Sequence, residues 1–271
     1  MNRAAAFFDL DRTLISGASL YPLGVQAWRE GLASNSDVAK WATSALAFII
    51  FGDKDGDSSD DMRNVLSQIA GASVSSMDAL GAAVLPHLTN KVRPEARKLI
   101  HLHHEAGRDT WIVSASPQKI VEPLAAVLGM TGAIGTRGEI IDDYYTGELD
   151  GPFVYGPGKA EAIEKLASDR NYELALCYSY SDSISDLPML DVVGHPVAVN
   201  PDSELYSVAR ERGWPIVIFS RKVKKALAFG GVGTGTIVAS IVAYALGRHH
   251  GRASALAQMA LRQLEEGSTP R

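Results

Sequence analysis

The sequence predicts an α/β protein with a parallel, doubly wound sheet of the Rossmann-like type, and two observations support this fold class. From about residue 94 onward, helical segments alternate with short apolar segments, which is typical of a parallel sheet covered by helices. Polar side chains follow directly after several of these apolar segments, at the edge where such sheets bind ligands. With 271 residues, 46% of them hydrophobic, the chain is long enough for one such core with a smaller inserted unit.

The first predicted strand covers residues 5–10 and runs into two aspartates. Asp9 and Asp11 are two residues apart, so their side chains would lie on the same face of an extended chain. Two carboxylates in an apolar segment repel each other and lose hydration, unless a cation or hydrogen-bond donors compensate. The sequence therefore predicts a positively charged partner for this pair.

Residues 17–90 are predicted to form an inserted helical cap. The segment is rich in alanine and lacks strand alternation, and Ser36 and Gly52 mark the predicted start and end of one helix. A cap of this kind excludes water from a reaction site and supplies specificity. The core would then consist of residues 1–16 and 91–220.

The remaining core elements are predicted to alternate. Helices are expected over residues 94–106 and in PQKIVEPLAAVLG and GPGKAEAIEKLASDR, and strands in DTWIVSAS, LALCYSYSD, HPVAVN and PIVIF, with an extended excursion at EIIDDYYTGEL. The histidines of HLHH, residues 101–104, are expected on a solvated helix face, because no third metal ligand accompanies them.

Polar residues at the strand ends and at one helix start form a series. They are Asp9, Asp11 and Thr13 in DLDRT, Ser114 in IVSAS, Lys159 in GPGKAEAI, and Asp182 and Asp186 in SDSISD. Each alone is typical of a helix cap or a solvated charge. Their order and spacing together resemble the haloacid dehalogenase superfamily of phosphotransferases over residues 5 to about 220. The similar branch contains the phosphoserine phosphatases and actinobacterial proteins that resemble them.

The resemblance implies a phosphatase with Mg²⁺ as its cofactor. Asp9 would be the nucleophile that forms an aspartyl-phosphate, and Asp11 would be the general acid and base. The metal site would comprise Asp9, Asp182 and Asp11, the last through its backbone carbonyl, with Asp186 supporting the metal shell. The cation would offset the repulsion between these acids and a phosphate dianion.

Lys159, Ser114 and Thr13 would bind the phosphate group of the substrate. A lysine supplies positive charge and a hydroxyl supplies a hydrogen bond to the transferring phosphoryl group, where charge stabilisation is the main source of catalysis. Arg63, in the predicted cap, and Ser185, in the last motif, are further candidates for contact with the substrate.

The expected substrate is a small phosphorylated metabolite. Phosphoserine phosphatases carry a glutamate shortly after the first motif that binds the substrate's ammonium group, whereas this chain has no acidic residue between Asp11 and Glu30. Two alternatives stay open. One is phosphoserine phosphatase itself, and the other is a membrane-tethered regulatory protein with a vestigial phosphatase site.

The composition limits which classes of partner and which cellular compartment are expected. The net charge of −5 gives no broad basic field of the kind that holds nucleic acid. A single cysteine, Cys177, permits no internal disulfide and fits a reducing compartment. We therefore expect a cytoplasmic catalytic domain that does not bind nucleic acid.

Residues 226–246 are predicted to cross a membrane as a helix, with a buried core helix as the alternative. The segment carries no charge and would extend about 31 Å, close to the thickness of a bilayer's hydrocarbon core. Lysine and arginine are denser on its N-terminal side, which predicts attachment to the inner face of the cell membrane. Gly231 and Gly235 could let two such helices pack as a homodimer, and residues 247–271 would form a short polar tail.

Overall fold

The computed structural model describes residues 3–19, 26 and 70–219 of the chain. One compact unit covers Met1–Ile216, and a second, Val217–Arg271, is described only over residues 217–219. The predicted membrane segment and the tail after it therefore lie outside the described residues. Within the described part of the chain, no helix is long and apolar enough to cross a bilayer.

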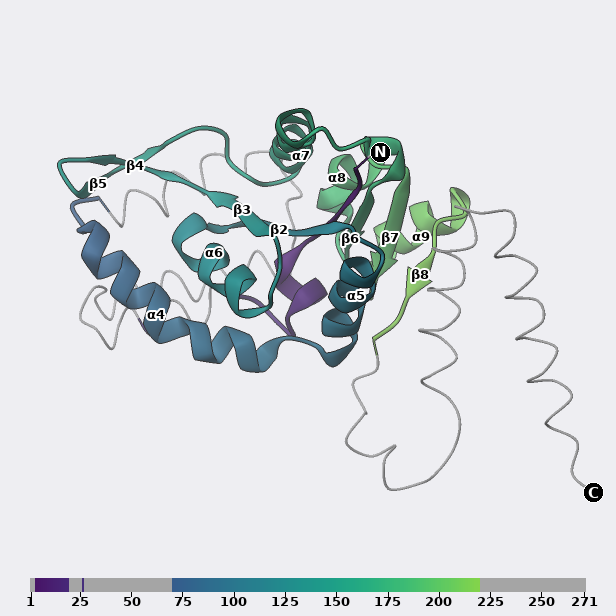
Figure 1. The fold of residues 1–271 in the computed structure, drawn as a ribbon, viewed down its shortest axis with the longest axis horizontal. Coiled ribbons are helices and arrows are strands. Elements are labelled where there is room, and N and C mark those ends of the chain that lie inside the picture. The colour runs from purple at the N-terminus through teal and green to yellow at the C-terminus, as the bar shows by residue number, and fades with distance from the viewer. Residues whose placement is uncertain (1–2, 20–25, 27–69, 220–271) are drawn as a thin grey trace, which may run out of the picture. The chain divides into compact units, whose positions relative to one another are not determined.

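A six-stranded sheet forms the centre of the fold (Figure 1). In spatial order its strands are β3 (Gly132–Thr136), β2 (Asp109–Pro117), β1 (Ala5–Phe8), β6 (Tyr178–Ser181), β7 (His195–Val199) and β8 (Ile216–Val217). The pairs β1–β2, β1–β6, β2–β3 and β6–β7 are all parallel. The chain leaves β1 toward β2 and β3 and returns on the other side with β6, so the topological switch point lies between β1 and β6.

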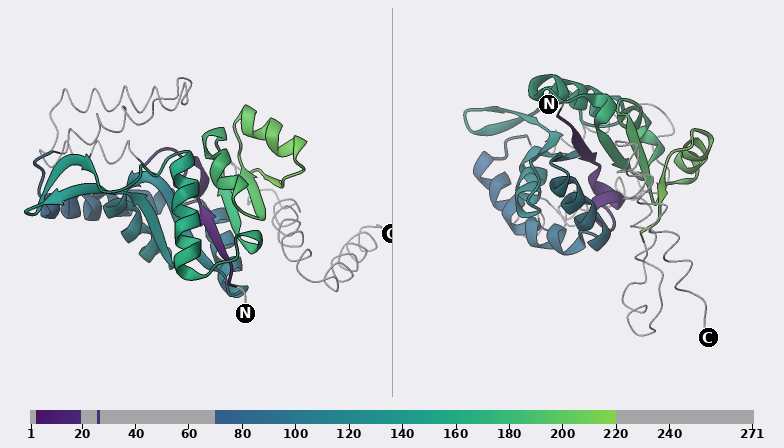
Figure 2. Two further views of the ribbon diagram at one scale, coloured as in Figure 1. Left: turned by 90° about the horizontal axis from the view of Figure 1, so that it is seen from above. Right: turned by 45° about the vertical axis from the view of Figure 1, so that its right-hand side comes forward.

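Helices cover both faces of this sheet (Figures 1 and 2). One face carries α5 (Pro94–Glu105) and α6 (Gln118–Val127), the other carries α7 (Pro157–Arg170) and α8 (Leu187–Asp191), and α9 (Ser203–Glu211) packs beside β7. Along β1, Phe7 joins a buried cluster with Ile163 and Met189, whereas Phe8 stacks on Tyr180 and contacts His103 of α5. The predicted doubly wound parallel sheet is confirmed.

A long helix, α4 (Val74–Lys91), forms the end of the predicted cap segment. Its N-cap is Ser73, whose hydroxyl accepts a hydrogen bond from the backbone N–H of Ser76. α4 packs so closely on α6 that a Cβ at Gly81 would lie 2.9 Å from the carbonyl oxygen of Lys119. Residues 20–25 and 27–69 lie outside the described residues, so the rest of the cap stays a prediction.

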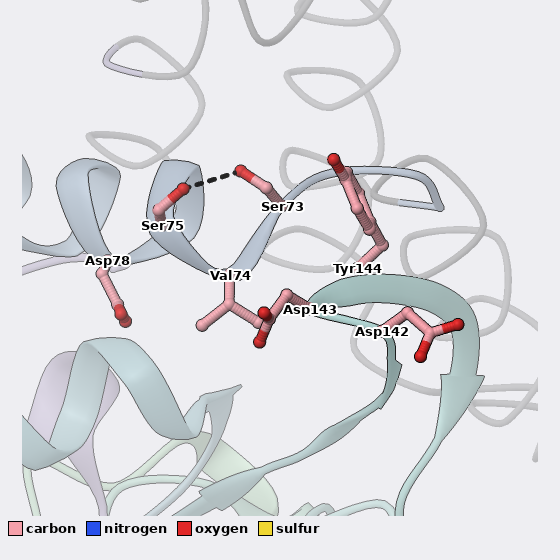
Figure 3. Close-up of a pocket in the computed structure, with 7 residues that line it drawn as sticks. All are labelled: Ser73, Val74, Ser75, Asp78, Asp142, Asp143 and Tyr144. Carbon is pink, nitrogen blue, oxygen red and sulfur yellow. Dashed lines mark hydrogen bonds between the residues drawn. The ribbon is translucent and has the colours of Figure 1, made fainter.

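The extended excursion predicted at EIIDDYYTGEL is an antiparallel hairpin of its own, β4 (Gly138–Ile141) and β5 (Tyr144–Leu149). Asp142 and Asp143 form its turn with φ angles of 50° and 66°, as a two-residue type I′ turn requires. This turn and the start of α4 line an open cavity of about 440 Å³ (Figure 3). None of the predicted site residues lines the cavity, so the predicted site lies elsewhere.

The expectation of a solvated face for HLHH is wrong for His103. The helical period of α5 places His103 on the same buried face as Ala96, Leu99 and Ile100. Its Nδ1 accepts a hydrogen bond from Arg108 Nε at 2.7 Å, so its Nε2 carries the proton and donates to the Tyr180 hydroxyl at 2.8 Å. Burial, with the nearby Arg108 charge, holds the pKa of His103 well below its usual value.

Candidate active site

The acidic pair lies at a wide turn, η1 (Leu10–Leu14), directly after β1. The backbone N–H of Asp9 still donates to the carbonyl of Tyr180 in β6 at 2.9 Å, so the sheet holds Asp9 in place. The N–H of Ile15 then donates to the carbonyl of Leu10 at 3.0 Å and closes the turn. Because β1 ends at Phe8 and Asp11 lies inside this turn, the strand alternation assumed from the sequence for Asp9 and Asp11 does not apply.

Lys159 joins two of the predicted acids. From the first turn of α7, its Nζ donates to Asp9 Oδ1 at 2.6 Å and to Asp186 Oδ2 at 2.8 Å. The Ser181 hydroxyl, at the end of β6, also donates to Asp186 Oδ2 at 2.6 Å. All four side chains are buried. Residues far apart in the sequence therefore meet at the carboxyl ends of β1 and β6, beside the switch point.

Glycines shape the loop that presents Lys159. Gly156 has a φ of 49°, a backbone conformation that favours glycine. Gly158 lies so close to the preceding chain that a Cβ would be 1.9 Å from the carbonyl oxygen of Phe153. The segment GPGK can therefore bring the first turn of α7, and Lys159 with it, tightly against the end of β1.

The charged cluster of the candidate site, formed by Asp9, Asp11, Lys159, Asp182 and Asp186, carries more negative than positive charge. Burial raises the pKa of Asp9 well above its ordinary value, and the neighbouring carboxylates of Asp186, Asp182 and Asp11 raise it further, against the opposing effect of Lys159. Burial by itself lowers the pKa of Lys159, but Asp186 and Asp9 outweigh it, so the net direction is upward. Lys159 is thus a charged group, and one lysine does not balance the acids around it.

Asp182 has different partners from Asp9 and Asp186. The Thr13 hydroxyl donates to its Oδ1 at 3.3 Å, and Arg12 Nε lies 2.9 Å from its Oδ2. Burial raises the pKa of Asp182 to about 7, while Arg12 opposes the shift and Asp186 adds to it. Asp182 Oδ2 and Asp186 Oδ1 are buried without a hydrogen bond from any residue that the structure describes.

Asp11 is held by Ser19, which in turn contacts Ser116, and sequence reasoning missed both serines. Its Oδ1 accepts a hydrogen bond from the backbone N–H of Ser19 at 2.6 Å, and its Oδ2 accepts one from the Ser19 hydroxyl at 3.0 Å. The Ser19 hydroxyl also lies 2.7 Å from that of Ser116, whose N–H donates to the Ser114 hydroxyl at 3.1 Å. Burial raises the pKa of Asp11, and the Ser19 hydrogen bonds oppose this. The spacing of Ser114 and Ser116 in SAS was the available signal.

The donor set fits a hard divalent cation. Two buried carboxylate oxygens, one each from Asp182 and Asp186, lack hydrogen bonds among the described residues, and oxygen ligands are those that Mg²⁺ prefers. Over the ranges described, no three His, Cys, Asp or Glu side chains are grouped to hold an ion by themselves. The predicted ligand set needs fewer, since Asp11 would contribute a backbone carbonyl.

The two predicted substrate contacts are Ser185 and Arg63, and Ser185 makes no hydrogen bond to the charged residues of the site within the part of the chain that the structure describes. Ser185 lies in the short helical turn Ile184–Asp186, where its hydroxyl donates to that of Ser183 at 3.1 Å. The Ser185 carbonyl oxygen would lie 3.6 Å from a Cβ at Gly156, so its backbone borders the loop before Lys159. Arg63 lies outside the described residues.

Proteins of known sequence or structure resemble this chain over most of its length. A probable phosphatase of Mycobacterium tuberculosis is 41% identical over 257 residues, which cover 90% of this chain and 89% of the relative. A phosphoserine phosphatase of the same species is 38% identical over 239 residues, covering 85% and 78%. A crystal structure of a Bordetella pertussis protein of unknown function has a TM-score of 0.71 at 25% identity and covers 80% of this chain and 99% of that one.

The family match extends over the candidate site. Haloacid dehalogenase-like hydrolases match residues 6–191, a range that contains all the described residues of the candidate site. Together with these relatives, the match confirms the predicted superfamily, its phosphoserine-phosphatase-like branch and the predicted class of enzyme, a phosphatase. The chain therefore belongs to the haloacid dehalogenase-like hydrolases.

Proposed function

We propose that this phosphatase is a magnesium-dependent phosphomonoesterase that hydrolyses a small phosphorylated metabolite through an aspartyl-phosphate on Asp9. The observation that carries the proposal is the buried Lys159, which contacts both Asp9 and Asp186 at the carboxyl end of the central strand. A buried cation beside a carboxylate suits a reaction in which that carboxylate must approach a phosphate dianion.

Asp9, Asp182 and the backbone carbonyl of Asp11 would hold Mg²⁺, with Asp186 in support. When bound, the ion supplies the positive charge that offsets repulsion between the carboxylates and the phosphate oxygens. The buried Asp182 Oδ2 and Asp186 Oδ1, which lack hydrogen bonds among the described residues, support this assignment.

The residues of the chain would carry the reaction in two steps. Asp9 Oδ attacks phosphorus and the bond to the leaving alkoxide breaks, while Asp11 gives that alkoxide a proton. Asp11 then accepts a proton from the water that attacks the aspartyl-phosphate, which releases phosphate and restores Asp9. Lys159, Ser114 and Thr13 hold the phosphoryl oxygens. The raised pKa of Asp11 supports its role, since it must begin the cycle protonated.

Phosphoserine is the second candidate substrate, because the phosphoserine phosphatase of Mycobacterium tuberculosis is 38% identical to this chain. The absence of an acidic residue between Asp11 and Glu30 leaves no matching partner for a substrate ammonium group in that stretch. We therefore favour a phosphate ester without an essential amine.

Arg63 and Ser185 stay candidate substrate contacts. A vestigial site is disfavoured, because the acids and Lys159 are all retained.

Attachment to the inner face of the cell membrane is a further part of the proposal. It rests on the uncharged segment 226–246 and on its basic flanks, and it leaves the catalytic domain in the cytoplasm. Pairing of two such helices through Gly231 and Gly235 would give a homodimer.

Hydrolysis of p-nitrophenyl phosphate tests the proposal directly. We expect activity with MgCl₂, none in EDTA, and recovery when MgCl₂ is restored. Acid quenching during turnover of a ³²P-labelled ester should trap radioactivity on the protein, at Asp9 by peptide mapping. Full activity in EDTA would contradict the metal requirement, and the absence of labelled protein at saturating substrate would contradict the covalent step.

A further inference from the structure

Arg12 is a charged residue of the candidate site that the proposed reaction leaves without a role. It lies between Asp11 and Thr13 in the turn after β1, and its side chain is 47% exposed although Asp182, its partner, is 4% exposed. Lys159, by contrast, is buried between its two carboxylates. The two cationic side chains therefore differ in exposure: Lys159 is buried, whereas Arg12 contacts Asp182 from the protein surface.

The backbone of Arg12 is strained. Its φ of 60° lies in the left-handed region, where residues with a Cβ are disfavoured and glycine is preferred. Such conformations are retained where the surroundings demand them, and they cluster at functional sites. Here the demand comes from the chain after β1, which bends back so that the N–H of Arg12 donates to the carbonyl of Gly17 at 3.1 Å.

Arg12 forms a close ion pair with Asp182 but no hydrogen bond. Arg12 Nε lies 2.9 Å from Asp182 Oδ2, yet the geometry does not make a hydrogen bond, and that oxygen has no other donor among the described residues. The guanidinium therefore supplies charge to this oxygen without using its lone pairs. A cation that ligates Asp182 would meet the same oxygen.

We propose that Arg12 is a displaceable counter-ion for Asp182, a positioning residue that lowers the affinity of the site for divalent cations. The inference rests on the proposed magnesium-dependent function. In the metal-free enzyme Arg12 offsets part of the charge of Asp182, and binding of the cation to Asp182 must first displace the guanidinium. The exposure of Arg12 gives it room to withdraw, which the enclosed Lys159 does not have.

Three variants of the full-length chain test this. Arg12→Gln removes the charge but keeps a long polar side chain, Arg12→Lys keeps the charge, and Arg12→Gly removes the side chain at a positive φ that glycine tolerates. Arg212→Gln is the matched control, since Arg212 is 42% exposed and paired with Asp191 in the last part of the core. The readout is the thermal unfolding midpoint of EDTA-stripped protein against MgCl₂ concentration, at constant ionic strength and without phosphate.

We expect the MgCl₂ concentration for half-maximal stabilisation to fall roughly three- to tenfold in Arg12→Gln and Arg12→Gly. Arg12→Lys should stay within about twofold of the wild type, and so should Arg212→Gln. An unchanged or higher midpoint concentration in both uncharged variants would overturn the inference while leaving the phosphatase proposal intact. A wild type that gains no stability from MgCl₂ and hydrolyses p-nitrophenyl phosphate without it would overturn both.

Discussion

Asp9, Asp11 and Asp182 each have a different partner, and this difference determines what a substitution should do. Asp9 contacts Lys159, Asp11 contacts Ser19, and Asp182 contacts Thr13 and Arg12. An amide in place of a carboxylate keeps the shape of the side chain but loses its charge and half of its acceptor capacity. Asparagine substitutions therefore separate the three roles.

Asp9→Asn should abolish turnover, because an amide neither attacks phosphorus nor balances Lys159. Asp11→Asn should lower kcat by about 10²–10⁴-fold, the usual contribution of acid–base catalysis. The measurement is steady-state hydrolysis of p-nitrophenyl phosphate by purified variants, with folding checked by circular dichroism. Near-normal activity in folded Asp9→Asn protein would eliminate the covalent mechanism.

Asp182→Asn should stabilise the metal-free fold at alkaline pH. Because the folded pKa of Asp182 is raised to about 7 from 3.8, its stabilising contribution is present below 3.8 and is lost as the pH rises through about 7. Because that pKa already includes the effect of Arg12, removing the charge should add at least ~1 kcal/mol at pH 8 and little at pH 4.

Urea unfolding in EDTA at both pH values measures this, with Asp191→Asn as the control at an acid paired outside the site. The same Asp182→Asn protein should lose most of the stabilisation that the wild type gains from MgCl₂. A variant less stable than the wild type at pH 8 would show that Asp182 is adequately compensated without metal.

At the scale of secondary-structure elements, α5 contains a buried histidine that should make the fold sensitive to acid. His103 has a folded pKa well below the ordinary histidine value of 6.5, so the unfolded chain binds a proton below that pH that the folded chain does not. Stability is therefore lost as the pH falls through about 6.5, by up to ~1.4 kcal/mol per pH unit.

His103→Gln should remove this dependence. Between pH 6.5 and 5.5 the wild type should lose about 1 kcal/mol more stability than the variant, as measured by urea unfolding. His101→Gln is the matched control, because His101 lies on the exposed side of the same helix and pairs with Glu105. Parallel pH profiles for His103→Gln and the wild type would show that His103 is protonated in the folded state.

The elements were largely predictable and their side-chain partners were not. Apolar runs that end in aspartate or serine indicate where parallel strands end, and a lysine after glycines indicates a helix start. Asp9, Ser114 and Lys159 could therefore be placed at the sheet edge, although β2 continues beyond Ser114 to Pro117. The contact of Ser19 with Asp11 depends on how the chain turns after β1, and no local pattern encodes that direction. His103 was misplaced because its polar side chain was weighed above its position in the helical period, which places it on the same face as Leu99 and Ile100.

At the scale of the whole molecule, the segment between Asp11 and Glu30 bears on substrate choice. Without an acid there to bind an ammonium group, the enzyme should favour phosphoserine over a neutral ester of the same size by less than about tenfold in kcat/KM, or under ~1.4 kcal/mol. Competition between phosphoserine and glycerol phosphate measures the ratio. A thousandfold preference for phosphoserine would show that another acid binds the amine.

The full-length chain should fractionate with membranes. Residues 226–246 predict a helix long enough to span the bilayer, so the protein should resist a high-salt wash, which removes proteins held by charge alone. A chain that ends at Ser220 should be soluble and active on p-nitrophenyl phosphate. Recovery of the full-length chain in the soluble fraction, or unfolding of the shortened chain, would show that the segment belongs to a folded core.

Gly158 limits how the enzyme can diverge during evolution. Any side chain at this position would collide with the carbonyl of Phe153, so replacement requires the whole loop before Lys159 to be rebuilt. A lineage could exchange the outward-facing residues of α7 one at a time, but it would have to change position 158 and the length of the preceding loop together. Among natural descendants of this gene, an altered residue 158 should therefore accompany an insertion or deletion between residues 150 and 157.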